Sequence, residues 1–95
     1  MAGYVVAQPL RVKDATGMDE YRAKLAATVE QDGGRFLVRG ADGQVLEGDW
    51  QPRLVIIEFA SAAQARAWYD SPEYRPLREL RQRCADTNLV VVDGV

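Results

Sequence analysis

Arg53-Leu54-Val55-Ile56-Ile57-Glu58-Phe59 is the stretch with the strongest strand pattern in this sequence. β-Branched and aromatic residues favour extended backbone, in which successive side chains point to opposite faces. Leu54 and Ile56 therefore point to one face, and the other apolar side chains of the stretch point to the opposite face. Because both faces are apolar, we expect both faces of the sheet that contains this strand to be covered.

A second strand, predicted over 88–93, has the same property, because Leu89 to Val92 are four consecutive apolar residues. An antiparallel sheet with helices on one face normally carries polar residues on the other face, which meets water. Here the simplest cover is a second copy of the chain, since closed two-fold dimers are the commonest oligomers. The sequence therefore predicts a homodimer formed through the sheet face, of the dimeric α/β-barrel type.

The rest of the sequence predicts two further strands and three helices. Further strands are expected over 3–12 and 35–39, with Pro9 at an edge or past the pairing because it cannot donate to a ladder. Helices are expected from about 18 to 31, from 62 through 69, and again after 71. The resulting βαββαβ order predicts an α+β fold, with a ferredoxin-like antiparallel sheet and helices on one face. At 95 residues without repeats or linkers, the chain is expected to be a single ferredoxin-like domain over 1–95.

Local signals predict where the helices begin. Ser61 followed by Gln64 resembles a capping box, in which the serine caps the helix and the glutamine reaches back. Ser71 and Pro72 suit the N-cap and the first helical position of the next helix. The stretch 44–48 can continue the preceding strand or form a short hairpin arm.

Composition excludes several classes of chemistry. The chain has no histidine and one cysteine, Cys84, so Ser-His-Asp systems, Cys-His systems, imidazole metal sites and internal disulfides are excluded. We expect no metal and no cofactor. The net charge of −2, with acidic and basic residues interspersed, argues against a nucleic-acid partner. No signal-like start or bilayer-length apolar run is present, so we expect a cytoplasmic location and no membrane association.

Three stretches together resemble a known family. They are 33–40 (Gly-Gly-Arg-Phe-Leu-Val-Arg-Gly), 47–53 (Glu-Gly-Asp-Trp-Gln-Pro-Arg), and 67–74 (Ala-Trp-Tyr-Asp-Ser-Pro-Glu-Tyr) followed by Arg78 and Arg81. The sequence is similar over its whole length to the domain of unknown function 1330 family. This resemblance implies a ferredoxin-like fold in the dimeric α/β-barrel superfamily. It implies no particular reaction, because the family has none established and its superfamily includes cofactor-free monooxygenases, decyclases, haem-degrading enzymes and binding proteins.

The sequence departs from that family at one turn. Many members have Arg-Gly-Gly after the second strand, whereas here Gly40 is followed by Ala41. If this position needs a positive φ, Ala41 is strained.

Two charged residues on the strands are candidates for a ligand pocket. Arg39 can clamp a carboxylate or an enolate, or else pair with Glu47 or Glu58 at the surface or the dimer rim. Glu58 lies between apolar neighbours, where burial would raise the pKa of a carboxyl and suit it to act as a general base. The alternative, which we favour, is a structural ion pair with Arg39 or Arg53.

A second group of candidates lies around the helix break. Ser71, Tyr74 and Arg81 are predicted to line a pocket between helix and sheet, with hydroxyls orienting a carbonyl and Arg81 holding an anion. The alternatives are a plain N-cap for Ser71 and core packing for Tyr74. Trp50 and Arg53 are candidates for a lid or, preferably for Trp50, for the dimer contact.

Three functions stay open from the sequence. The chain is a small enzyme without metal or nucleotide that acts on a carbonyl, carboxylate or phenolic compound, or a dimer that binds a small anionic metabolite without reaction. The third possibility is a structural module whose polar residues only stabilise the dimer.

Overall fold

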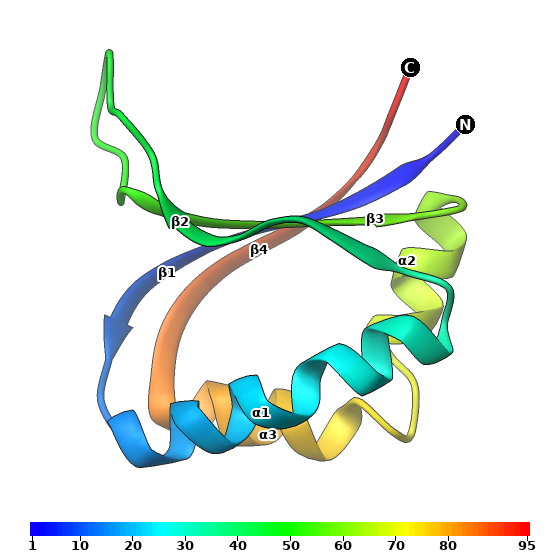
Figure 1. Cartoon of the computed structure of the whole chain (residues 1–95), viewed down its shortest axis with the longest axis horizontal. Coiled ribbons are helices and arrows are strands. Elements are labelled where there is room, and N and C mark those ends of the chain that lie inside the picture. The colour runs from blue at the N-terminus through cyan, green and yellow to red at the C-terminus, as the bar shows by residue number, and fades with distance from the viewer.

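The computed structural model describes residues 1–95 and contains four strands and three helices (Figure 1). The elements are β1 (Gly3–Val12), α1 (Ala15–Gln31), β2 (Arg35–Asp42), β3 (Arg53–Phe59), α2 (Ala62–Tyr69), α3 (Arg75–Cys84) and β4 (Ala85–Asp93). The strands form one sheet in the order β2-β3-β1-β4, and every neighbouring pair is antiparallel. The predicted α+β, ferredoxin-like plan is therefore confirmed.

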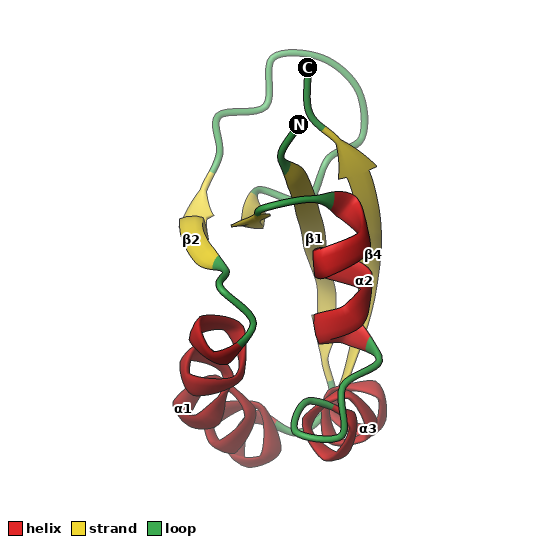
Figure 2. Ribbon diagram, turned by 90° about the vertical axis from the view of Figure 1, so that its right-hand side faces the viewer, coloured by secondary structure: helices red, strands yellow, loops and turns green.

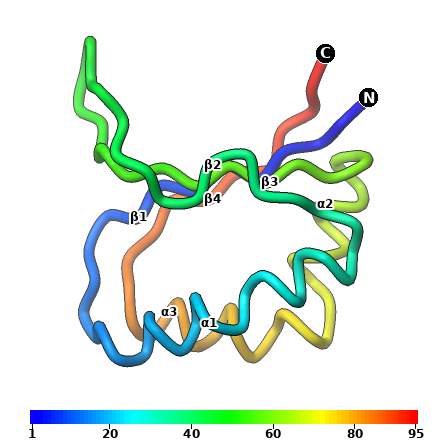
Figure 3. Tube along the Cα trace, in the orientation of Figure 1, coloured from blue at the N-terminus to red at the C-terminus, as the bar shows by residue number.

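All three helices lie on one face of the sheet, as Figures 1 and 2 show. Helix α2 packs directly on β1 and β4, whereas α1 packs mainly on α3. The loop between β2 and β3 extends to the opposite side, away from α1 and α3 (Figure 3). We call the helix-covered side of the sheet the inner face and the other side the open face.

The register of the strands decides which side chains reach each face. Val5 of β1 pairs with Ile57 of β3, and both are buried on the inner face. The next pair, Val6 and Ile56, points to the open face. The open face stays apolar at β4 as well, where Val90 is 55% exposed. The prediction that both faces of the sheet are apolar is correct.

Aromatic side chains pack the helices against the inner face. The Trp68 ring lies 5.6 Å from the Phe59 ring and 4.1 Å from the Tyr74 ring, measured between centroids. The indole Nε1 of Trp68 donates to Thr28 Oγ1 at 3.1 Å, so the buried N–H has a partner. These contacts hold α2, α1 and the segment before α3 against one another.

The helix starts partly follow the local signals. Ser61 caps α2 by accepting from the Gln64 N–H at 3.0 Å, as predicted. The reciprocal half of the capping box is wrong, because the Gln64 side chain donates instead to the carbonyl oxygen of Asp32. That bond ties the start of α2 to the end of α1.

The helix after the break begins later than predicted. Ser71 Oγ accepts from the Tyr74 N–H at 3.2 Å and donates to the Trp68 carbonyl at 2.8 Å, so it closes a turn of its own. Helix α3 then begins at Arg75, and the proline in its first turn is Pro76. The proposal of Ser71 as N-cap and Pro72 as first helical residue is therefore wrong, because Pro72 is used inside the turn.

Three smaller expectations are also resolved. Residues 44–48 neither extend β2 nor form a hairpin arm. Pro9 lies past the β3 pairing, which ends at Ala7, although it stays opposite Thr87 of β4. Strand β2 has its positive φ at Gly40 (76°) and not at Ala41, so Ala41 carries no strain.

None of the helices has the length and apolar character needed to span a bilayer.

Candidate functional site

A cavity of about 120 Å³ lies between the inner face of the sheet and α1. We call it the inner cavity. Most of its walls are apolar, with Val5, Ile57, Leu25, Phe36 and Trp68 among them. It exists because α1 packs on α3 more closely than on the strands, so that side chains do not fill all of the space between α1 and the sheet. An apolar chamber with a few polar groups is the usual form of a small-molecule site.

The charged groups on the walls of the inner cavity are all positive. Four arginines line it (Arg22, Arg39, Arg53 and Arg81), and no carboxylate does. The Arg39 guanidinium lies 4.5 Å above the Phe36 ring, and Arg53 Nε donates to the Gly40 carbonyl at 3.4 Å. The cavity therefore favours an anion.

Arg81 is the most deeply placed of the four. Its position in α3, one turn after Leu77 and three residues before Cys84, puts all three side chains on the buried side of the helix. Arg81 is 7% exposed, and its Nε has no hydrogen-bond partner. A buried N–H that is left unpartnered is costly, so this group is a strong candidate for a ligand contact.

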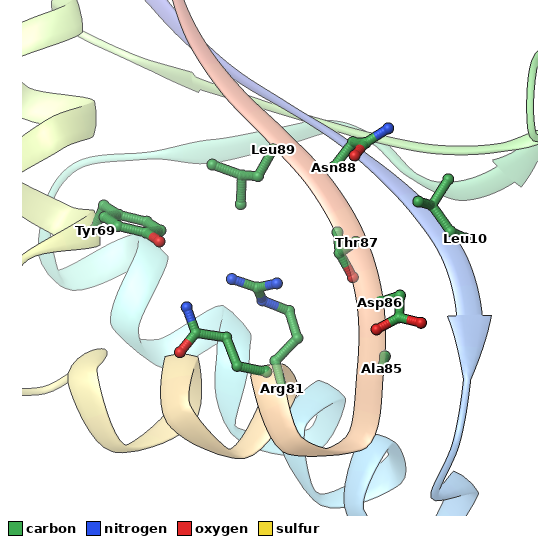
Figure 4. A pocket seen from close by; sticks show the side chains of 9 residues that line it. Leu10, Tyr69, Arg81, Ala85, Asp86, Thr87, Asn88 and Leu89 are labelled. Carbon is green, nitrogen blue, oxygen red and sulfur yellow. The ribbon is translucent and has the colours of Figure 1, made fainter.

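Arg81 also borders a second, wider pocket on the outside of the molecule (Figure 4). This outer pocket has a volume of about 450 Å³ and lies between α3 and β4. Thr87 and Leu89 line both hollows together with Arg81. Figure 4 shows the guanidinium of Arg81 rising from α3 toward Leu89 and Tyr69. Arg81 thus stands between the outer pocket and the inner cavity.

Tyr21 of α1 lines the inner cavity. Its oxygen lies 2.7 Å from that of Tyr74, and either hydroxyl can donate in this pair. Burial, together with the neighbouring Tyr74, raises the pKa of Tyr21 far above its usual range, while Arg81 acts in the opposite direction. The Tyr21 phenol therefore stays protonated and serves as a hydrogen-bond group rather than as a base.

The structure places Ser71 and Tyr74 behind the cavity wall. Tyr74 is fully buried, and Tyr21 and Trp68 line the cavity in its place. Ser71 is engaged with the backbone of its own turn. Of the three residues predicted to line a pocket together, Ser71, Tyr74 and Arg81, the structure brings only Arg81 to the wall of the inner cavity.

Glu58 lies on the open face of the sheet, away from the inner cavity. It pairs across the strands with Tyr4 of β1 and Arg35 of β2. Arg35 Nε donates to Glu58 Oε1 at 2.7 Å, and the Tyr4 hydroxyl donates to Oε2 at 3.3 Å. A structural ion pair was the favoured interpretation, but the predicted partners Arg39 and Arg53 are wrong. Both point to the inner cavity instead.

Two members of the site do not stand out in the sequence. Tyr21 follows Met18 and precedes Leu25 at helical spacing, a pattern typical of core packing. The sequence predicts Arg53 as a lid or dimer residue or as a partner of Glu58, yet it lines the inner cavity. The only sequence signal for these roles is that a hydroxyl and a cation occur at otherwise apolar positions.

Trp50 lies on the other side of the sheet, in the loop that leads into β3. It is 60% exposed and borders a shallow hollow on the open face with Val6, Leu54 and Val90. It does not line the inner cavity. No group of three or more carboxylates or thiols is arranged to hold a metal ion.

A family model described as a domain of unknown function, DUF1330, matches residues 2–95. The chain belongs to the DUF1330 family. No curated protein matches this DUF1330 chain. A solved protein of unknown function from Rhodopseudomonas palustris is 19% identical, with a TM-score of 0.75 over 99% of this chain and 82% of that one.

Two further solved structures share the fold of this DUF1330 chain. A dimeric ferredoxin-like protein of unknown function from Jannaschia sp. CCS1 is 14% identical, with a TM-score of 0.70 over 99% of this chain and 100% of that one. SnoaB, a cofactor-independent oxygenase from Streptomyces nogalater, is 13% identical, with a TM-score of 0.63 over 99% of this chain and 92% of that one. At these identities the likeness concerns the fold alone.

Proposed function

We propose that this chain binds a small anionic compound in the inner cavity. The observation that carries the proposal is Arg81, which is 7% exposed and has an unpartnered Nε at a wall that holds no carboxylate. Burying a cation is expensive unless a charge or a set of acceptors compensates it. Because the protein supplies no carboxylate here, an anionic ligand would complete the site.

The polar groups at the cavity favour binding over proton abstraction. Tyr21 and the four arginines are the titratable side chains on its walls, and the raised pKa of Tyr21 keeps its proton in place. Such groups donate hydrogen bonds and stabilise an oxyanion. A cofactor-independent reaction on a compound that enolises readily is the alternative function, and SnoaB, which shares the fold, is described as a cofactor-independent oxygenase.

We also propose that two copies associate through the open face. Val90 and Val92 are 55% and 47% exposed there, and Trp50 borders a hollow beside them. Contiguous exposed apolar surface of this kind usually marks an interface. Similar solved proteins from Jannaschia sp. and Thermobifida fusca are described as dimeric ferredoxin-like proteins.

The binding proposal is tested with a thermal-shift panel of small aliphatic and aromatic acids, followed by titration calorimetry on the wild type and Arg81→Met. Methionine keeps an unbranched, apolar stem but removes the charge. We expect acids to raise the melting temperature of the wild type, and Arg81→Met to bind at least tenfold more weakly. Arg66→Met is the control, because Arg66 is exposed, pairs with Asp70 and does not line the inner cavity.

The same variants separate binding from a purely structural role for Arg81. If Arg81 serves a ligand, its removal relieves an unpartnered buried group, and Arg81→Met should be as stable as the wild type or more so. If Arg81 only stabilises the fold, the variant should lose stability while no acid shifts the wild type. That second outcome would overturn the proposal. Incubating the best binders with the protein and following their absorbance then tests for turnover.

A further inference from the structure

The inner cavity limits the size of the ligand that the proposed function requires. Its volume of about 120 Å³ is close to the roughly 150 Å³ of an engineered cavity that accepts benzene. Nucleotides and other drug-sized ligands need roughly 300 Å³ or more. Apolar walls surround most of this space, so the body of the ligand should be apolar and no larger than about one ring.

The hydrogen bond between the hydroxyls of Tyr21 and Tyr74 has a preferred donor. If Tyr21 donates to Tyr74, the Tyr74 proton needs an acceptor of its own. Tyr74 is fully buried, and its hydroxyl neighbours are Tyr21 and Arg81, of which Arg81 can only donate. If Tyr74 donates to Tyr21, the free proton is that of Tyr21, the tyrosine of this pair that lines the cavity. The second arrangement leaves no unpartnered proton inside the protein, because a ligand in the cavity can accept it.

Arg81 and Tyr21 both line the inner cavity and carry donors of different kinds. The Arg81 Nε–H has no hydrogen-bond partner, and the Tyr21 O–H is free to donate when Tyr74 donates to Tyr21. A carboxylate has two oxygens in one plane and accepts from two such donors at once. A phosphate has more oxygens to satisfy and a stronger hydration shell to lose against apolar walls.

We infer that the ligand is a planar carboxylate on a single-ring or short apolar body, and that Tyr21 is a specificity-determining donor oriented by Tyr74. This inference rests on the proposed function, because it assumes that the inner cavity binds an anion. It adds the chemical class of the ligand and a second residue that contacts it. Tyr74 acts through Tyr21 and is a positioning residue.

The test uses benzoate as the probe, with benzamide as a neutral compound of the same shape and inorganic phosphate as an anion without an apolar body. Calorimetric titrations are made on the wild type, Tyr21→Phe, Tyr74→Phe and the control Tyr69→Phe.

We expect benzoate to bind the wild type at least tenfold more tightly than either other compound. Tyr21→Phe should lose about tenfold for benzoate, since a hydrogen bond to a charged group is lost. Tyr74→Phe should lose about two- to fivefold, since the polarisation of Tyr21 is lost, and Tyr69→Phe should bind like the wild type.

A spectroscopic readout separates positioning from packing. Tyrosine labelled with ¹³C at Cζ reports the hydrogen bonding of each hydroxyl, and the Tyr21 resonance is assigned by its loss in Tyr21→Phe. Benzoate should move this resonance in the wild type and move it less in Tyr74→Phe. Equal movement in both proteins would show that Tyr74 does not orient Tyr21.

The possible failures are distinguishable. If no probe binds, or if binding is the same in Arg81→Met, the proposed function fails and the inference fails with it. If benzoate binding depends on Arg81 but is unchanged in Tyr21→Phe, only the role of Tyr21 fails. If phosphate binds as tightly as benzoate through Arg81, the carboxylate class is wrong while the anion site stands.

Discussion

The hydroxyl oxygens of Tyr21 and Tyr74 lie 2.7 Å apart, and this hydrogen bond joins α1 to the turn that precedes α3. The two residues are 53 positions apart in the chain. Their rings meet edge to face, with centroids 6.3 Å apart. The bond therefore connects the packing of the helices to the wall of the inner cavity. A substitution at either tyrosine should affect both the stability of the protein and the cavity wall.

The first prediction concerns stability at high pH. Burial raises the pKa of Tyr21 above its ordinary value of 10.0 in the folded state. Both states keep the proton below pH 10, whereas above it the unfolded state releases the proton and the folded state does not. The free energy of unfolding should therefore fall as pH rises above 10, by up to about 1.4 kcal/mol per pH unit from this group.

Denaturant titrations between pH 8 and pH 11.5 measure this effect. Tyr21→Phe should show a shallower decline than the wild type, and Tyr69→Phe should keep the wild-type decline. Identical curves for the wild type and Tyr21→Phe would contradict the burial of an un-ionised Tyr21.

The second prediction concerns Glu58, which lies on the opposite side of the sheet from the inner cavity. Its ion pair with Arg35 is partly exposed, with 25% of the Glu58 side chain and 72% of the Arg35 side chain accessible. Such pairs contribute less than about 1 kcal/mol. Glu58→Gln should therefore lower the free energy of unfolding only slightly and leave benzoate affinity within about twofold of the wild type. A tenfold loss of affinity in Glu58→Gln would instead place the ligand on the open face.

The third prediction concerns the association of two copies. A lysine at position 90 would put a charge on the apolar open face, where Val90 is 55% exposed. We expect sedimentation at micromolar concentration to show a dimer for the wild type and a monomer for Val90→Lys, because a charge buried at an interface is costly. Ala23→Lys, at an exposed position of α1, is the control and should stay dimeric. A monomeric wild type would rule out the open-face dimer.

The fourth prediction compares the two glycines between α1 and β2. Gly33 has a φ of 76° and open space around the position of a Cβ, whereas a Cβ on Gly34 would lie 2.6 Å from the Phe59 ring. Gly33→Asn should therefore be tolerated better than Gly33→Ala, which should cost about 1 kcal/mol. Gly34→Ala should cost more, about 2 kcal/mol or above, because it forces the core apart. Thermal unfolding of the three variants measures the order, and a Gly34→Ala that melts with the wild type would contradict the packing at Phe59.

The order of the elements could be predicted because hydrophobic periodicity is a local property. Leu54 and Ile56 alternate with their apolar neighbours in β3, and Leu77, Arg81 and Cys84 recur on one side of α3. The helix boundary that was predicted wrongly lies where a turn can make the same hydrogen bond as a helix N-cap. Ser71 satisfies a cap-like hydrogen bond in a turn, and the helix begins only at Arg75.

The sequence by itself determined that β3 and β4 are apolar on both faces and that a charged side chain lies on the buried side of α3. Tertiary structure decided which face of the sheet the helices cover. A pattern that is apolar on both sides does not specify this, so the side on which Glu58 or Arg39 would lie could not be predicted. Packing of the helices on the face of Ile57 placed Glu58 outside and Arg39 at the cavity. The same packing brought Tyr21 to Tyr74, a contact between residues too distant in the chain for any local pattern to reveal.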